Sequence, residues 1–405
     1  MSKWLLNIRL ETGESYYPDG SIKTETELFH IEIADHKIAS IIPASISIEA
    51  DDVEDMQGLL ALPAFKEMHN HLDKTYLSLP WKACRSVSGL QERLHLEALE
   101  LSELSVTGVQ RSSAMIEKII GNGVNHIRTH VNIDPYIGLK NLETTLEALE
   151  KYKKYVTAEV IAFPQHGLLR NQVPQLMRDA LRNGATMVGG LDPAGIDRNI
   201  EASLAETMDI AQEFNIDVDF HLHDDGSVGL YTIDKWLDMV EETGFSKHTA
   251  FSHAFSLGHG TESEKIKMAK RLQQHNVSIM STVPFNVGRV IPPIDLLSEH
   301  GVQVQFGCDG FYDSWSPYGS GDILSKANVY ADLTRKIEER QLRQALRFIT
   351  NGVTPLNNEG EKQWPVVGDL ADFVFLPSSC SAEAVARPPH ADTRRVMNKG
   401  AFFPK

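Results

Sequence analysis

The chain has 405 residues, of which 42% are hydrophobic, enough for one large catalytic domain and a smaller companion. Its formal net charge of −16, without clustered Lys and Arg, argues against a nucleic-acid-binding surface and leaves small neutral or cationic substrates open. Cys84, Cys308 and Cys380 are too few and too scattered for a disulfide framework, so we expect a cytoplasmic protein. We expect no contact with membranes, because no apolar run approaches the roughly 20 residues of a membrane helix.

The first sixty residues predict short strands and turns over 4–10, 28–33 and 38–42. From Leu59 onward, short apolar strands alternate with amphipathic helices, which is the pattern of parallel βα units. The eight strand candidates are 60–65, 124–131, 158–164, 187–191, 217–222, 249–256, 277–283 and 302–307. Helices are predicted over 109–120, 141–154, 200–214 and 262–275, among others. This order favours a (β/α)8 barrel of the TIM type over an open doubly wound sheet, and no Gly-rich dinucleotide turn follows the first strand.

The end of the chain returns to strands. A turn at Gly368-Asp369 precedes a strand that ends near Pro377, and residues 395–403 predict one or two more strands. We therefore expect a small β-sandwich domain built from both termini, with residues 1–59 and 359–405 flanking a barrel over residues 60–358.

The run His69-Asn70-His71 places two imidazoles two residues apart near the end of the first barrel strand. Side chains two apart on an extended segment point the same way, so both rings can reach one metal ion. Such a pair alone is as easily a packing or surface feature. Its meaning therefore depends on whether other strands supply the missing groups.

Active sites of (β/α)8 barrels lie at the carboxyl ends of the strands, and polar residues gather there in this sequence. Taken singly, a His in an apolar strand is more often a core residue, and an Asp after a strand is commonly a turn or helix cap. Five coincidences at the same end of one barrel indicate an active site instead. Besides the first pair, the residues concerned are Gln165 and His166, His221, His223 and Asp224, His253, and Asp309.

These residues carry a family resemblance. The series His69-x-His71, His221, His253 and Asp309 resembles the amidohydrolase superfamily of metal-dependent hydrolases. The segments 125–131 and 162–165 are similar to its cytosine deaminase-like branch, and 188–193 and 219–224 are similar to N-isopropylammelide isopropylaminohydrolases, which degrade triazines. The likeness runs from about Leu62 to Phe375 and includes the terminal strands.

The resemblance implies that His69, His71, His221 and Asp309 bind one divalent ion, commonly Zn²⁺ and in some relatives Fe²⁺. Three imidazoles and a carboxylate leave room for a water whose pKa the ion lowers toward about 7. Relatives with two metals usually bridge them with a modified Lys on strand four. Strand four here is Met187-Val188-Gly189-Gly190-Leu191, so we expect a single ion.

The reaction implied is attack of hydroxide on an amidine-like ring carbon, with loss of ammonia or an amine. In that reading His253 and Asp309 orient and deprotonate the water, and Asp224 carries the proton to the substrate, assisted by His223. Gln165 would hydrogen-bond the ring edge, as its counterpart does in cytosine deaminase.

Two departures count against cytosine as the substrate. Cytosine deaminase has Glu at the position of Asp224, and a second Asp where this chain has Gly310. A related heterocycle such as a triazine, or an N-substituted amine leaving group, is favoured. Lys74 is a candidate anchor for the substrate or a surface ion pair, and Trp315 is a candidate stacking partner or barrel-mouth packing residue.

Two alternatives stay open. The first is another hydrolysis on the same scaffold, such as cyclic amide opening or N-deacetylation, because fold and ligand set are shared across these reactions. The second is a catalytically inactive relative that only binds a metal or a heterocycle. In either case we expect a small-molecule ligand and a homo-oligomer, since relatives are usually oligomeric.

Overall fold

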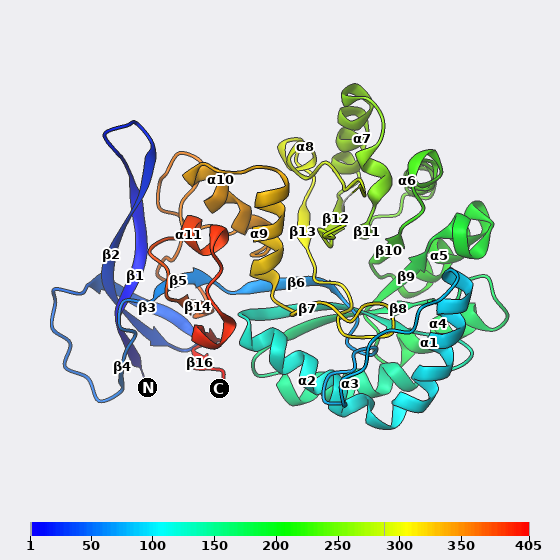
Figure 1. The fold of residues 1–405 in the computed structure, drawn as a ribbon, viewed down its shortest axis with the longest axis horizontal. Helices are drawn as coiled ribbons and strands as arrows, with labels where there is room; N and C mark the ends of the chain where they lie inside the picture. Colours follow the sequence, from blue (N-terminus) through cyan, green and yellow to red (C-terminus); the bar gives the residue numbers. More distant parts are fainter. Residues whose placement is uncertain (1, 287, 405) are drawn as a thin grey trace.

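The computed structural model describes residues 2–286 and 288–404 and contains two sheets. Figure 1 shows the sheet of the two termini on the left and the larger sheet with its helices on the right. No helix in the described part of the chain is long and apolar enough to span a membrane.

Eight parallel strands form the nearly closed barrel that the sequence predicts. Each strand lies beside the strands that precede and follow it in the chain. They are β6 (Phe65–Asn70), β7 (Val124–Asn132), β8 (Thr157–Phe163), β9 (Met187–Leu191), β10 (Val218–Leu222), β11 (Thr249–His253), β12 (Val277–Ser281) and β13 (Val304–Phe306). The (β/α)8 fold is thereby confirmed.

The first and last barrel strands approach each other at a glycine. The Asp309 amide donates to the His69 carbonyl over 2.8 Å, and a Cβ at Gly307 would lie 2.4 Å from the His69 Cβ. The Glu67 carboxylate also accepts from the His69 amide at 3.1 Å and from the Cys308 amide at 2.9 Å. The strand that carries the first histidine is therefore tied directly to the strand that carries Asp309.

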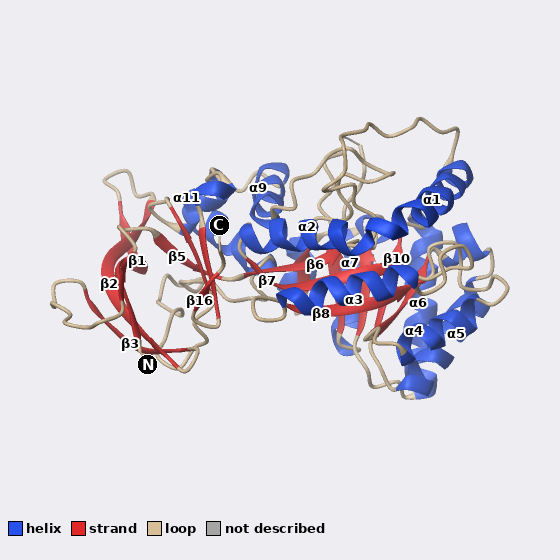
Figure 2. Cartoon of the chain, turned by 90° about the horizontal axis from the view of Figure 1, so that it is seen from below, coloured by secondary structure: helices blue, strands red, loops and turns tan. Residues whose placement is uncertain are grey.

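Helices cover the outside of the barrel, as Figure 2 shows from below. They are α2 (Gly108–Gly121), α3 (Lys140–Tyr152), α4 (Val173–Arg182), α5 (Ile200–Phe214), α6 (Gly226–Thr243), α7 (Glu262–Gln274), α8 (Ile294–Glu299) and α9 (Ile323–Leu333). The short helix α10 (Glu339–Gln344) follows α9 and lies beside the terminal sheet. An additional helix, α1 (Leu90–Leu104), lies in the long connection between β6 and α2. The sequence analysis predicted α2, α3, α5 and α7 to within two residues at each end.

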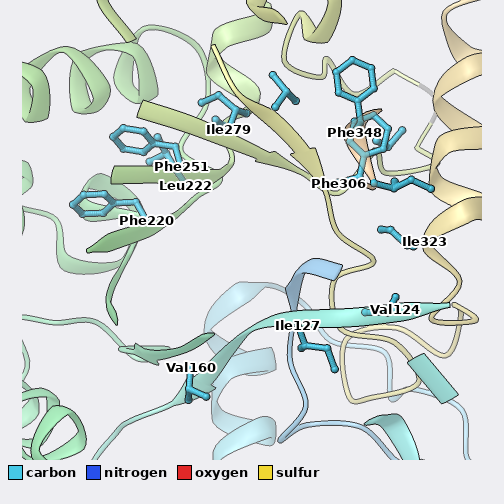
Figure 3. Packing of buried hydrophobic residues seen from close by; sticks show 14 of the residues in the cluster. Val124, Ile127, Val160, Phe220, Leu222, Phe251, Ile279, Phe306, Ile323 and Phe348 are labelled. Carbon is cyan, nitrogen blue, oxygen red and sulfur yellow. The ribbon is translucent and has the colours of Figure 1, made fainter. Parts of the chain in front are cut away.

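Successive side chains along the barrel strands point alternately to the outer apolar layer and to the barrel interior. On β10, Phe220 packs against Trp236 of α6, with ring centroids 4.7 Å apart, and stacks on Phe251 of β11 at 5.3 Å. Figure 3 shows Phe220 and Phe251 side by side on neighbouring strands in this apolar layer. Because successive side chains on a strand face opposite ways, Asp219 and His221 are directed into the barrel.

Both termini contribute to the second sheet, as predicted. Its strands are β1 (Lys3–Tyr16), β2 (Ile22–Ala34), β3 (Lys37–Pro43), β4 (Val53–Asp55), β5 (Leu60–Pro63), β14 (Phe373–Leu376), β15 (Arg395–Asn398) and β16 (Ala401–Phe402), and β5 joins β14 to β1. A short helix, α11 (Ser381–Ala386), follows β14.

One strand prediction needs correction. The sequence analysis took residues 60–65 as the first barrel strand, but Leu60–Pro63 pairs antiparallel with β14 in the terminal sheet, and the barrel strand begins at Phe65. Residues 60–65 are all buried. The sequence therefore stays buried and apolar where the chain passes from the terminal sheet to the barrel. Only the pairing partners distinguish the two strands.

Candidate active site

Four side chains from different barrel strands converge at the carboxyl ends of the strands. They are His69 of β6, His221 of β10, His253 at the end of β11, and Asp309 just after β13. One nitrogen or oxygen atom of each lies within 4.8 Å of the others. The three histidines are buried, whereas the Asp309 side chain is 38% exposed. This is a compact donor set that opens to one side.

His71 borders this group. Its Nε2 lies 3.5 Å from Asp309 Oδ1, and His69 Nε2 lies 3.7 Å from the same oxygen. The His69-x-His71 pair thus faces one carboxylate, as the spacing predicts. The compact group shares His69, His221 and Asp309 with the predicted ligand set, and His71 as the remaining ligand stays a prediction.

Backbone geometry turns two of these side chains toward the centre. His253 and Asp309 have φ values of 65° and 66°. The left-handed region costs a residue with a Cβ about 1–3 kcal/mol, and such positions gather at active sites. In this conformation His253 Nε2 comes to 2.9 Å from His221 Nε2, although the preceding Ser252 also faces the barrel interior.

Electrostatics keep the imidazoles neutral. Burial lowers the pKa of His69, His71, His221 and His253 well below the ordinary value, and neighbouring cationic and imidazole groups add to the effect. His69 Nε2 is buried and has no hydrogen-bond partner among the described residues. Neutral rings beside a carboxylate are the donors that a divalent ion such as zinc prefers. The residues present therefore fit a metal ion.

Two glycines of strand four, β9, are packed closely by their neighbours. A Cβ at Gly190 would lie 2.4 Å from Phe220 Cδ1, and one at Gly189 would lie 2.8 Å from the Ala162 carbonyl oxygen. Larger side chains at these positions would collide with the neighbouring strands. The number of metal ions stays a prediction.

His223 lies beside the donor group and is held by Asp192. Its Nδ1 is 2.9 Å from Asp192 Oδ2, and its ring centroid is 4.2 Å from that of His253. The packing of protein atoms around His223 lowers its pKa, but the charge and hydrogen bond of Asp192 raise it by more, so the net shift is upward. The sequence analysis did not assign Asp192, although it lies in the segment 188–193.

Asp224 points its carboxylate at the backbone. Asp224 Oδ2 accepts from the Ala194 amide at 2.8 Å, and Oδ1 accepts from the Gly195 amide at 3.0 Å. Burial and the nearby Asp192 raise its pKa above the ordinary value, while these amides act in the opposite direction. Both oxygens thus serve the turn after β9.

Lys74 and Trp315 meet at Glu97, a residue without a predicted role, and Lys74 also binds Gln165. Lys74 Nζ donates to Gln165 Oε1 and lies 3.1 Å from Glu97 Oε1 on α1. Trp315 Nε1 donates to the same Glu97 oxygen at 2.8 Å. Lys74 is only 4% exposed, so it is not a surface ion pair. Nothing in the local sequence distinguishes Glu97 from the other acidic residues of α1, because its partners are far away in the chain.

His130 is a second buried residue that the sequence analysis left unassigned. It lies on β7, and its ring is 4.5 Å from that of His69 and 4.9 Å from that of His221. Within residues 2–286 and 288–404, neither of its nitrogens has a hydrogen-bond partner. The sequence signal was available, because His130 stands near the carboxyl end of strand two.

A nearly closed parallel barrel with imidazoles and a carboxylate at the carboxyl ends of its strands defines the class of barrel hydrolases that use a metal ion. The model of the amidohydrolase family matches residues 52–398. The chain belongs to this family. Its relatives and structural neighbours of known activity are hydrolases and deaminases that act on C–N bonds.

Relatives and solved structures agree with this assignment. The chain is 39% identical over 388 residues to the uncharacterized protein YahJ of Escherichia coli, covering 95% of this chain and 84% of the relative. It is 29% identical over 367 residues to N-isopropylammelide isopropyl amidohydrolase of a Pseudomonas species, covering 88% and 89%. The structure of N-isopropylammelide isopropylaminohydrolase from Burkholderia multivorans superposes with a TM-score of 0.84 at 29% identity, covering 99% of this chain and 98% of the other. A 5-methylcytosine deaminase from Klebsiella pneumoniae, at 23% identity with 99% and 98% coverage, shares the fold with a TM-score of 0.79.

Proposed function

We propose that this protein hydrolyses a C–N bond on a small nitrogen heterocycle, releasing ammonia or an amine, at a site with one divalent metal ion. The observation that carries the proposal is the convergence of His69, His221, His253 and Asp309 within 4.8 Å, beside a histidine held by a carboxylate. A (β/α)8 barrel alone would not support it, since that fold hosts many chemistries.

The metal would be held by His69, His221 and Asp309, with His71 completing the set as the sequence predicts and His253 adjacent. When bound, a divalent ion of this kind lowers the pKa of a coordinated water and supplies a nucleophile at neutral pH. Zn²⁺ is the first candidate because the donors are imidazoles and a carboxylate, and Fe²⁺ is the second.

Proton transfer falls to His223 in this proposal. Its Nδ1 is fixed by Asp192, which leaves Nε2 as the atom that can take or give a proton beside His253. Asp224, the carrier expected from the sequence, has both oxygens engaged by backbone amides. We therefore assign Asp224 to holding the turn and His223 to moving the proton, with Asp309 and His253 orienting the nucleophile.

Substrate recognition is assigned to the group around Lys74. Because Lys74 Nζ donates to Gln165 Oε1, the Gln165 amide nitrogen is left to donate to a carbonyl oxygen or ring nitrogen of the substrate. Trp315, which is 39% exposed, offers a flat face for stacking on a ring. An acceptor-rich ring, such as an oxidised triazine or a pyrimidinone, suits these contacts.

The test couples metal analysis to a screen for ammonia and amine release. Full-length protein loaded with Zn²⁺ or Fe²⁺ is incubated with N-isopropylammelide, cytosine, 5-methylcytosine and pterins. We expect about one ion per chain, release of ammonia or isopropylamine from at least one compound, and loss of both metal and turnover in His221→Ala. Ring opening without amine release would replace the proposal with cyclic amide hydrolysis, and metal binding without any turnover would favour the inactive relative.

A further inference from the structure

Beneath the donor group, a chain of buried polar side chains crosses four barrel strands. His69 Nδ1 lies 2.8 Å from Ser252 Oγ, and Ser252 Oγ donates to Asp219 Oδ1 over 2.8 Å. Asp219 Oδ2 accepts from Arg128 Nη1 at 3.0 Å. His69, Ser252 and Asp219 are fully buried and Arg128 is 5% exposed. Barrel interiors are usually filled by branched apolar residues, so this polar layer needs an explanation.

The direction of each hydrogen bond follows from the groups involved. A guanidinium only donates, so Asp219 Oδ2 is an acceptor, and a carboxylate facing Arg128 has no proton to give through Oδ1. The single hydroxyl hydrogen of Ser252 is therefore donated to Asp219. Its oxygen then accepts from His69, which places the ring proton of His69 on Nδ1.

That tautomer is the one a metal ligand needs. With its proton on Nδ1, His69 presents the lone pair of Nε2 to the donor group, where Nε2 has no hydrogen-bond partner in the part of the chain that the structure describes. His71 is fixed differently, because its Nδ1 lies 3.1 Å from the backbone carbonyl oxygen of His130. Of the two histidines in the motif, only His69 depends on side chains for its tautomer.

We propose that Ser252, Asp219 and Arg128 are positioning residues that hold His69 in its metal-binding tautomer and so set the affinity of the site for its ion. This inference rests on the metal site of the proposed function. It goes further in assigning a role to three residues that touch neither the ion nor the substrate.

The test measures Zn²⁺ affinity of the full-length apo protein by competition with a chromophoric chelator, so that no substrate is required. Ser252→Ala removes the acceptor for His69 Nδ1 and is expected to weaken Zn²⁺ binding by about 10–100-fold, the usual effect of losing such a partner. The matched control is Ser278→Ala on β12, because Ser278 is equally buried and its hydroxyl has no hydrogen-bond partner among the residues described. The control should leave affinity within about twofold of the wild type.

Asp219→Asn gives the sharper outcome because it reverses the direction of the hydrogen bonds from Arg128 to His69. Arg128 would hold the amide oxygen of Asn, which turns the NH₂ group toward Ser252. Ser252 would then donate to His69 Nδ1 and drive the ring proton to Nε2. We expect weaker Zn²⁺ binding than in Ser252→Ala. In this background, Ser252→Ala should raise the affinity again, because it removes the misdirected donor.

Additive losses in the double variant, or unchanged affinity in Ser252→Ala, would overturn the proposal. Thermal melting of each apo variant separates folding from metal affinity, and if Asp219→Asn does not fold, Ser252→Ala against Ser278→Ala still decides. A wild-type protein that binds no Zn²⁺ would refute the metal site itself, which is a different result from a site that binds Zn²⁺ and ignores Ser252.

Discussion

His223 and Asp224 are adjacent in the chain, and we expect opposite effects on kcat when each is replaced by a residue with an amide side chain. His223→Gln keeps a polar side chain beside Asp192 but cannot carry a proton, so kcat should fall by about 10²–10⁴-fold, the contribution typical of general acid–base catalysis. Asp224→Asn keeps one oxygen for the amides of Ala194 and Gly195 and loses the other. It should cost about 1–3 kcal/mol of stability and leave kcat within about tenfold of the wild type.

The assay for this pair is steady-state amine or ammonia release, with metal content and thermal melting measured on the same samples. Metal content must match the wild type in both variants, because a loss of the ion would lower kcat for another reason. The reasoning is refuted if metal-loaded Asp224→Asn loses 10²-fold or more in kcat while His223→Gln stays near normal. The proton carrier would then be Asp224, as the sequence analysis expected.

Three further predictions concern stability and recognition. Burial raises the pKa of Asp313 to about 7, so the folded apo protein loses stability as the pH rises from the ordinary aspartate pKa through 7. The free energy of unfolding of Asp313→Asn, measured in urea relative to the wild type, should therefore be about 3 kcal/mol more favourable at pH 8.5 than at pH 5. The same difference from the wild type at both pH values would contradict this. Gly307→Ala should destabilise the fold by about 1–3 kcal/mol and weaken Zn²⁺ binding, because its Cβ would lie 2.4 Å from that of His69; an unchanged melting temperature would show that the strands separate freely. Glu97→Gln weakens the ion pair with Lys74 and should raise KM more than it lowers kcat, whereas an equal fall in kcat and kcat/KM would indicate a role in the chemical step.

The fold was accessible from the sequence because the barrel strands are short apolar runs between amphipathic helices. The predicted strand over 187–191 and the predicted helix over 200–214 match β9 and α5 residue for residue. The error at residues 60–65 shows the limit of this signal. Hydrophobicity reports that a strand is buried, but it does not report which sheet pairs with it.

The site was accessible in outline for a different reason. The position of a residue at the carboxyl end of a barrel strand is a property of the local sequence, and it brought together His69, His71, His221 and Asp309. The Asp224 carboxylate instead accepts hydrogen bonds from amides at residues 194 and 195, about thirty positions earlier in the chain. Long-range partners of this kind leave no mark on the sequence around the residue.

The two-residue period that identified the first histidine pair applies equally to β10. Asp219, His221 and His223 are spaced two apart, so one strand and its extension direct a buried carboxylate, a metal-ligand candidate and the proposed proton carrier into the barrel. That spacing distinguishes His223 from Asp224, which faces the other way. β11 breaks the same rule, because Ser252 and His253 are adjacent and both face inward. Only the left-handed backbone at His253, with φ of 65°, permits this, and such a turn is rare for residues other than glycine, asparagine, aspartate and histidine. The position that periodicity could not place is therefore the one where the backbone bears strain to bring a second imidazole against His221.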